Sequence, residues 1–171
     1  MNQDDLANTP SQPNPLPITA DEIRSRLQAL AELEPGIAQA AQRLIQSTVP
    51  ELMVEVFDYL TNTPPTTSLD QVGRSFMGGF LMQVKALEPM EPRLSLRKLN
   101  ENSLELSARQ TVYGRSFRND RLVLFIAGGE RTITIRVSES GEVKMNNQII
   151  DDSPEWESEL RQKVTQELSK T

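Results

Sequence analysis

The chain has 171 residues, with 18 basic side chains, 24 acidic ones and a formal net charge of -6 at pH 7. It contains no cysteine and no histidine. These absences exclude disulfides, thiolate nucleophiles, Ser-His-Asp triads and metal sites built on imidazole or thiolate. The length is that of one domain with a substantial core.

The chain divides into a tail and a folded part. Residues 1–18 carry four prolines and little apolar material, which predicts a disordered proline-rich tail. Residues 19–171 then form a single α+β domain. No run of 18 apolar residues occurs, and the N-terminus has no basic region followed by an apolar one. We therefore expect no membrane span, no secretory signal and a cytoplasmic location.

Helical patterns occupy residues 19–88. Thr19 and Glu22 form a capping box before an amphipathic helix that ends near residue 33. Further helices are predicted over residues 37–47 and from Pro50 to residue 60. A second capping box at residues 68–71 opens a fourth helix, which is apolar nearly all round and extends to about Leu87.

The pattern changes to period two in residues 93–150, where we predict an antiparallel β-meander of about five strands. The strands expected cover residues 94–99, 104–113, 121–127, 132–137 and 143–150. Gly128 and Gly129 indicate a two-residue hairpin turn. A C-terminal amphipathic helix over residues 153–170 closes the domain. The predicted fold is α+β, with N-terminal helices packed on the meander and the last helix beside them.

Charge is concentrated in the strand region. Residues 93–136 hold nine basic and four acidic groups, whereas residues 1–92 have a balance of -7 and residues 137–171 a balance of -4. The alternation puts Arg109, Tyr113 and Arg136 on the polar face of the sheet. That face is a candidate site for nucleic acid or a small anion. One aromatic side chain and an overall negative field disfavour nucleic acid, and cross-strand pairing with Glu105 is the structural alternative.

The predicted strand connection at residues 113–121 has the densest cluster of cations. Arg115, Arg118 and Arg121 surround Phe117, a composition typical of interface hot spots. The alternative is an ordinary charged hairpin loop with Phe117 folded onto the core. We predict that these four residues contact an acidic surface of a partner protein.

The fourth predicted helix suggests another mode of binding. Phe76, Met77, Phe80 and Met82 could line an apolar groove for a peptide, as in a chaperone, or a contact in a homodimer. A buried core helix is the structural alternative.

The leading hypothesis is thus a non-catalytic adaptor, assembly factor or regulator that binds an acidic protein. Acidic residues at 151–159 lie at a helix start, where they complement the helix dipole. Their spacing does not match a calcium loop, and no catalytic, phosphate-binding or dinucleotide motif is present. We expect no cofactor, no metal and no enzymatic activity.

Overall fold

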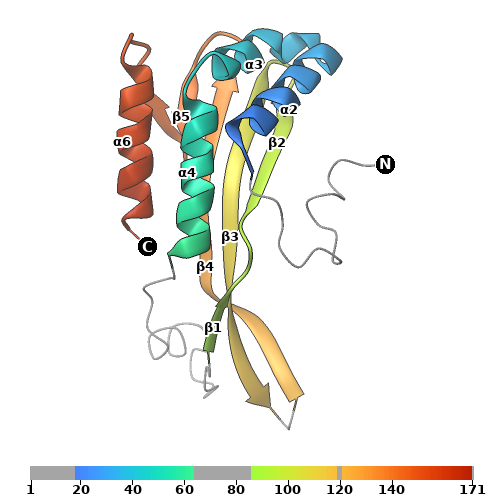
Figure 1. Cartoon of the computed structure of the whole chain (residues 1–171), viewed down its shortest axis with the longest axis vertical. Coiled ribbons are helices and arrows are strands. Elements are labelled where there is room, and N and C mark those ends of the chain that lie inside the picture. Colours follow the sequence, from blue (N-terminus) through green and yellow to red (C-terminus); the bar gives the residue numbers. More distant parts are fainter. Residues whose placement is uncertain (1–17, 64–85, 119–120, 171) are drawn as a thin grey trace.

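The fold has two layers, a six-stranded antiparallel sheet and a group of helices on one face of it (Figure 1). The computed structural model describes residues 18–63, 86–118 and 121–170. Within these, the side chains of residues 86–89, 114–118 and 121–129 are not described. The predicted α+β class and the segregation of helices from strands are confirmed.

The helix layer follows the predicted pattern closely. Its helices are α2 (Ala20–Leu33), the 3-10 turn η1 (Pro35–Ile37), α3 (Ala38–Ile45), α4 (Val49–Asn62) and α6 (Trp156–Leu168). The Thr19 hydroxyl accepts a hydrogen bond from the Glu22 amide, so half of the first capping box is present. The last helix begins at Trp156 and not at Ser153, because residues 153–155 form a turn in which Ser153 Oγ accepts from the Glu155 amide.

A long hairpin forms the centre of the sheet. β3 (Ser103–Arg118) pairs with β4 (Arg121–Ser138) along its whole length. β1 (Ala86–Pro89) and β2 (Arg93–Asn100) both pair with the other edge of β3. β5 (Val143–Met145) and β6 (Gln148–Ile150) continue the sheet beyond β4.

Three boundary predictions were wrong. Gly128 and Gly129 do not turn the chain, because β4 continues through them and the β3–β4 register shifts there, with Val112 opposite Gly129 and Tyr113 opposite Ile126. A glycine pair suits such a bulge as well as it suits a turn. The segment expected as a loop at 113–121 is mostly strand. The predicted fourth helix lies largely in residues 64–85, outside those described, but Ala86 and Leu87, at its expected end, belong to β1.

The predicted last strand is a small hairpin. Asn146 and Asn147 have positive φ angles of 47° and 70°, and Met145 pairs with Gln148 across them. Two residues in the left-handed region form the turn that matches the twist of a β-hairpin. The Asn146 side chain also bonds to β4, accepting from the Thr134 amide and donating to the Thr132 carbonyl. The pair thus ends β5 and holds the turn against β4.

The core lies between the helices and one face of the sheet. Alternate residues of β3 and β4 point into it, which confirms the period-two pattern, and the predicted inward positions of α6 are buried or packed against it. The largest fully buried side chains are Ile23, Leu27, Ile37, Leu44, Met53, Leu60, Leu104, Leu106, Ile133, Ile135, Met145 and Leu160. In the described part of the chain, no helix is both long and apolar enough to cross a membrane.

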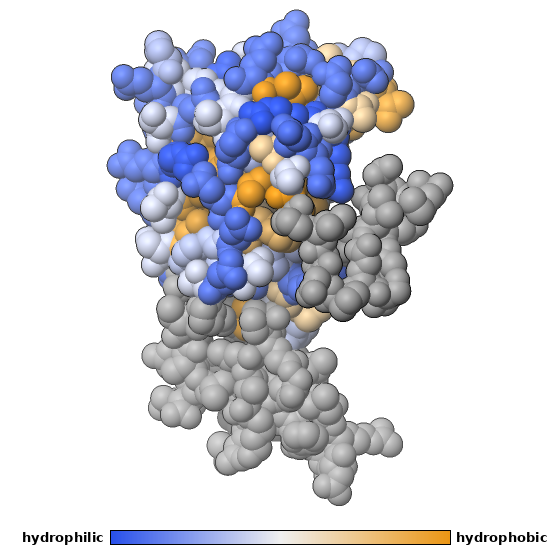
Figure 2. All heavy atoms as spheres, in the orientation of Figure 1, coloured by the Kyte–Doolittle hydropathy of each residue, from blue (hydrophilic) through white to orange (hydrophobic). Residues whose placement is uncertain are grey.

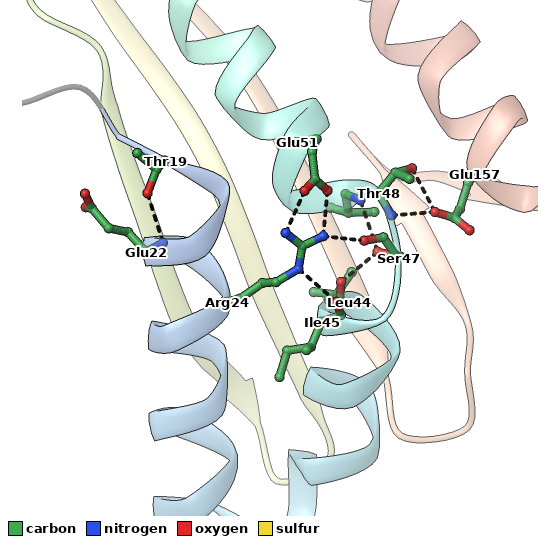
Figure 3. A network of polar contacts seen from close by, with 10 residues as sticks. Thr19, Glu22, Arg24, Leu44, Ile45, Ser47, Thr48, Glu51 and Glu157 are labelled. Carbon is green, nitrogen blue, oxygen red and sulfur yellow. Dashed lines mark hydrogen bonds and ion pairs between the residues drawn. The ribbon is translucent and has the colours of Figure 1, made fainter.

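A polar network fixes the helices to one another (Figure 3). Arg24 of α2 donates to both carboxylate oxygens of Glu51 at 2.6 and 2.7 Å, and to the carbonyls of Ile45 and Ser47. This hydrogen bonding raises the pKa of Arg24 and lowers that of Glu51. Glu157 of α6 accepts from the amide and hydroxyl of Thr48. The start of α4 is thereby joined to both α2 and α6.

Candidate functional site on the open face of the sheet

The face of β2, β3 and β4 that points away from the helices is polar, and we call it the open face. Its rows follow from the strand register, in which Arg97, Glu105 and Arg136 lie side by side across the three strands. The view in Figure 1 is from the helix side, so the open face is at the back. Its members among these strands are Arg93, Ser95, Arg97, Ser103, Glu105, Ser107, Arg109, Thr111, Glu130, Thr132, Thr134, Arg136 and Ser138.

The helix side is a poorer candidate for binding. Figure 2 shows mostly hydrophilic described surface there, with apolar areas that are small and separate. The large apolar side chains that are exposed among the described residues are Leu33, Met90, Leu99 and Ile149, which come from different elements. Single exposed apolar residues are normal on a protein surface. The open face, by contrast, combines charge with a regular array.

A charged row crosses the middle of the open face. Glu105 accepts from Arg97 Nε and from Arg136 Nε, each at 3.0 Å, and its own side chain is only 6% exposed. Burial raises the pKa of Glu105, but the hydrogen bonds and charges of the two guanidinium groups outweigh it, so the pKa is lowered. The expected cross-strand pairing with Glu105 is therefore present, and it fixes two arginines in place.

This internal pairing does not neutralise the face. One carboxylate lies between two guanidinium groups, and the Arg97 side chain remains 62% exposed. Arg109 has a longer ion pair with Glu130, at 3.7 Å, and is 57% exposed. Arg93 is exposed and has no ion-pair partner within the described ranges. The face thus has a surplus of positive charge in a chain that is acidic as a whole.

The residues predicted to bind an anion are spread along the sheet. Arg136 lies opposite Glu105, whereas Arg109 lies opposite Thr132, four residues along β4 or about 13 Å away. Tyr113 is further along, beyond the bulge. A hollow of about 170 Å³ does occur beside Arg136, lined also by Thr132, Thr134, Asn146 and Asn147. It includes Arg136 but not Arg109 or Tyr113, and anion binding by these three residues stays a prediction.

The residues predicted to contact a partner lie in the far half of the hairpin. Arg115, Phe117 and Arg118 belong to β3 and Arg121 begins β4, with Arg118 opposite Arg121. Their side chains are not described, so the contact stays a prediction. The predicted apolar groove is also untested, because Phe76, Met77, Phe80 and Met82 lie outside the described residues.

Sequence reasoning missed a buried arginine on the helix side of the sheet. Arg131 is 5% exposed and donates through Nε to Gln110 Oε1, and through Nη2 to the carbonyls of Leu60 and Thr63 at the end of α4. Burial lowers the pKa of Arg131, and the dipole of α4 favours a cation at this position. The alternation of the strand could have shown that Arg131 points inward, because it has the same parity as the inward-facing Ile133 and Ile135.

The acidic residues near the start of α6 act in the structure as hydrogen-bond acceptors. Glu159 accepts from the Asp151 amide, Asp152 pairs with Arg43 at 3.4 Å, and Glu157 binds Thr48. In the described ranges, no group of three or more potential metal-ligating side chains comes together. These contacts give three of the acidic residues at 151–159 a structural role.

Comparisons of the chain with protein-family models, with curated proteins and with solved structures find no match.

Proposed function

We propose that this protein is a non-catalytic, cytosolic interaction module that binds an acidic surface of a partner protein. The contact is made by the open face together with the adjoining hairpin residues Arg115, Phe117, Arg118 and Arg121. The observation that supports this most is the surplus of exposed guanidinium groups on an ordered sheet face in an acidic chain. Charge complementarity of this kind steers partners together and selects among them.

The arrangement of the arginines favours a broad protein surface over a small ligand. Arg97 and Arg136 are held by Glu105 from opposite sides, which reduces the entropy lost when further acceptors bind to their remaining donors. Arg93 and Arg109 are neighbours across β2 and β3 and repel each other. An acidic partner group between them would remove that repulsion.

The test is affinity capture from native extract with two variants of equal charge change. Arg93→Glu with Arg109→Glu reverses charge on the open face, while Arg161→Glu with Lys163→Glu does so on α6. We expect acidic proteins to be retained by the wild type at low salt and lost at high salt. The open-face variant should lose them, and the α6 variant should keep them. Urea denaturation of each variant confirms that the fold is intact. Equal retention by both variants would refute the proposal.

A further inference from the structure

Within the described ranges, β2 is an edge strand of the sheet. Among the described strands it pairs only with β3, and its outer backbone groups have no backbone partner in that part of the chain. It has eight residues, whereas β6, at the opposite edge, has three. A long edge with unpaired amide and carbonyl groups is a template for one more strand.

The two faces of β2 differ in chemistry. Arg93, Ser95 and Arg97 belong to the open face and are exposed. Leu94 and Leu96 point to the helix side, where they pack against the core but remain only partly buried. Their cross-strand partners Ala108 and Leu106 are completely buried. The core is therefore incompletely covered at β2, and another strand there would bury more of the two leucines.

We propose that β2 receives an extended segment of the partner in which acidic and apolar residues alternate. Backbone hydrogen bonds would add the segment as a further strand. Its acidic side chains would then lie beside Arg93 and Arg97, and its apolar side chains beside Leu94 and Leu96. This inference rests on the proposed function and specifies how the acidic partner is recognised.

A second copy of the chain is a poorer occupant of the same edge. Antiparallel pairing of two β2 strands about Ser95 would place Arg93 opposite Arg97 of the other copy. Like charges directly opposite each other destabilise a sheet. The charge on β2 therefore favours an acidic segment over its own sequence.

The test uses three capped ten-residue peptides with the full-length protein. One alternates glutamate with valine, one has the same composition in blocks, and one replaces each glutamate with lysine. Anisotropy titration should show that the alternating acidic peptide binds at least tenfold more tightly than the other two. Hydrogen exchange should show slower exchange at β2 amides when it is bound. Arg93→Glu should weaken binding about tenfold, whereas the control Lys163→Glu should not change it.

Any of the following outcomes would overturn the inference that β2 receives an added strand. Equal binding of the blocked and alternating acidic peptides would mean that charge alone is recognised, which leaves the proposed function standing. Protection of β2 without peptide in a dimeric protein would assign the edge to a second copy. Lack of binding by every peptide would refute the added strand. The proposed function fails independently, if reversing charge on the open face leaves partner capture unchanged.

Discussion

Glu105 is the residue on which the open face depends most. Its carboxylate is buried among side chains of the face and forms an ion pair with each of two arginines, which would otherwise repel each other. Hydrogen bonds to a charged group contribute about 1.5–3 kcal/mol each before solvent screening, and the exposure of Arg97 and Arg136 reduces that. The contribution of Glu105 is therefore local, and it depends on the ionised form.

We expect Glu105→Gln to lower the free energy of unfolding by about 2 kcal/mol at pH 7. Because the pKa of Glu105 is lowered on folding, its stabilising effect is complete above the unfolded value, about 4.3, and is lost as pH falls through the folded value. The difference between wild type and variant should thus shrink in acid. Urea denaturation at several pH values measures it, with Glu142→Gln as an exposed control. A difference independent of pH would contradict this account.

The end of α4 and the middle of β4 are joined by Arg131 and Gln110. Gln110 donates to the carbonyls of Leu60 and Met90 while its own oxygen accepts from Arg131. The two side chains thus satisfy helix carbonyls that have no partner within α4. Replacing either Arg131 or Gln110 leaves the polar groups of the other side chain buried without partners. Replacing both side chains removes those groups as well, so fewer buried polar groups remain unpaired.

We expect Arg131→Met to cost about 3 kcal/mol of stability and Gln110→Leu about 2 kcal/mol. The double variant should cost less than the sum by about 1–2 kcal/mol, because the two residues share one network. A double-mutant cycle from urea denaturation gives this coupling. Additive losses would mean that Arg131 and Gln110 act independently.

At the scale of the whole molecule, the distribution of charge also protects the sheet. Arg93 and Arg97 on β2 discourage edge-to-edge pairing of copies. We expect Arg93→Thr with Ser95→Val to cause self-association that increases with concentration in sedimentation velocity. Thr132→Val with Thr134→Val makes the same face more apolar on an interior strand and should not. If both variants stay monomeric, the charge on β2 is not what prevents two copies of the chain from pairing at this edge.

The helices and strands could be predicted where local patterns are strong. The hydrophobic periods of α2, α4 and α6 are each satisfied by one buried face, so sequence reasoning located these helices to within a few residues. It recognised the alternation of β3 and β4 but not where these strands end. Gly128 and Gly129 misled it, because the same dipeptide serves a turn or a bulge. The pairing of β3 with β4 on both sides of the glycines decides which occurs.

The candidate site was predictable only in part. The alternation correctly placed Arg109 and Arg136 on one polar face, and it suggested Glu105 as a partner. Alternation does not place Arg97 on either face, because Leu94, Leu96 and Leu99 do not share one parity. In the structure, the register shifts between Lys98 and Asn100, so Leu99 is exposed and Arg97 reaches Glu105.

The sequence by itself determined the class of fold, the chemistry that the chain lacks and the concentration of positive charge in its strands. These follow from composition and from residues within four positions of one another. Only the tertiary structure decided that Arg136 shares Glu105 with Arg97, that Arg131 binds carbonyl groups at the end of α4 and that β2 is an edge strand among the described residues. Those facts depend on contacts between residues as far as 71 positions apart, whose register is set by the packing of whole elements.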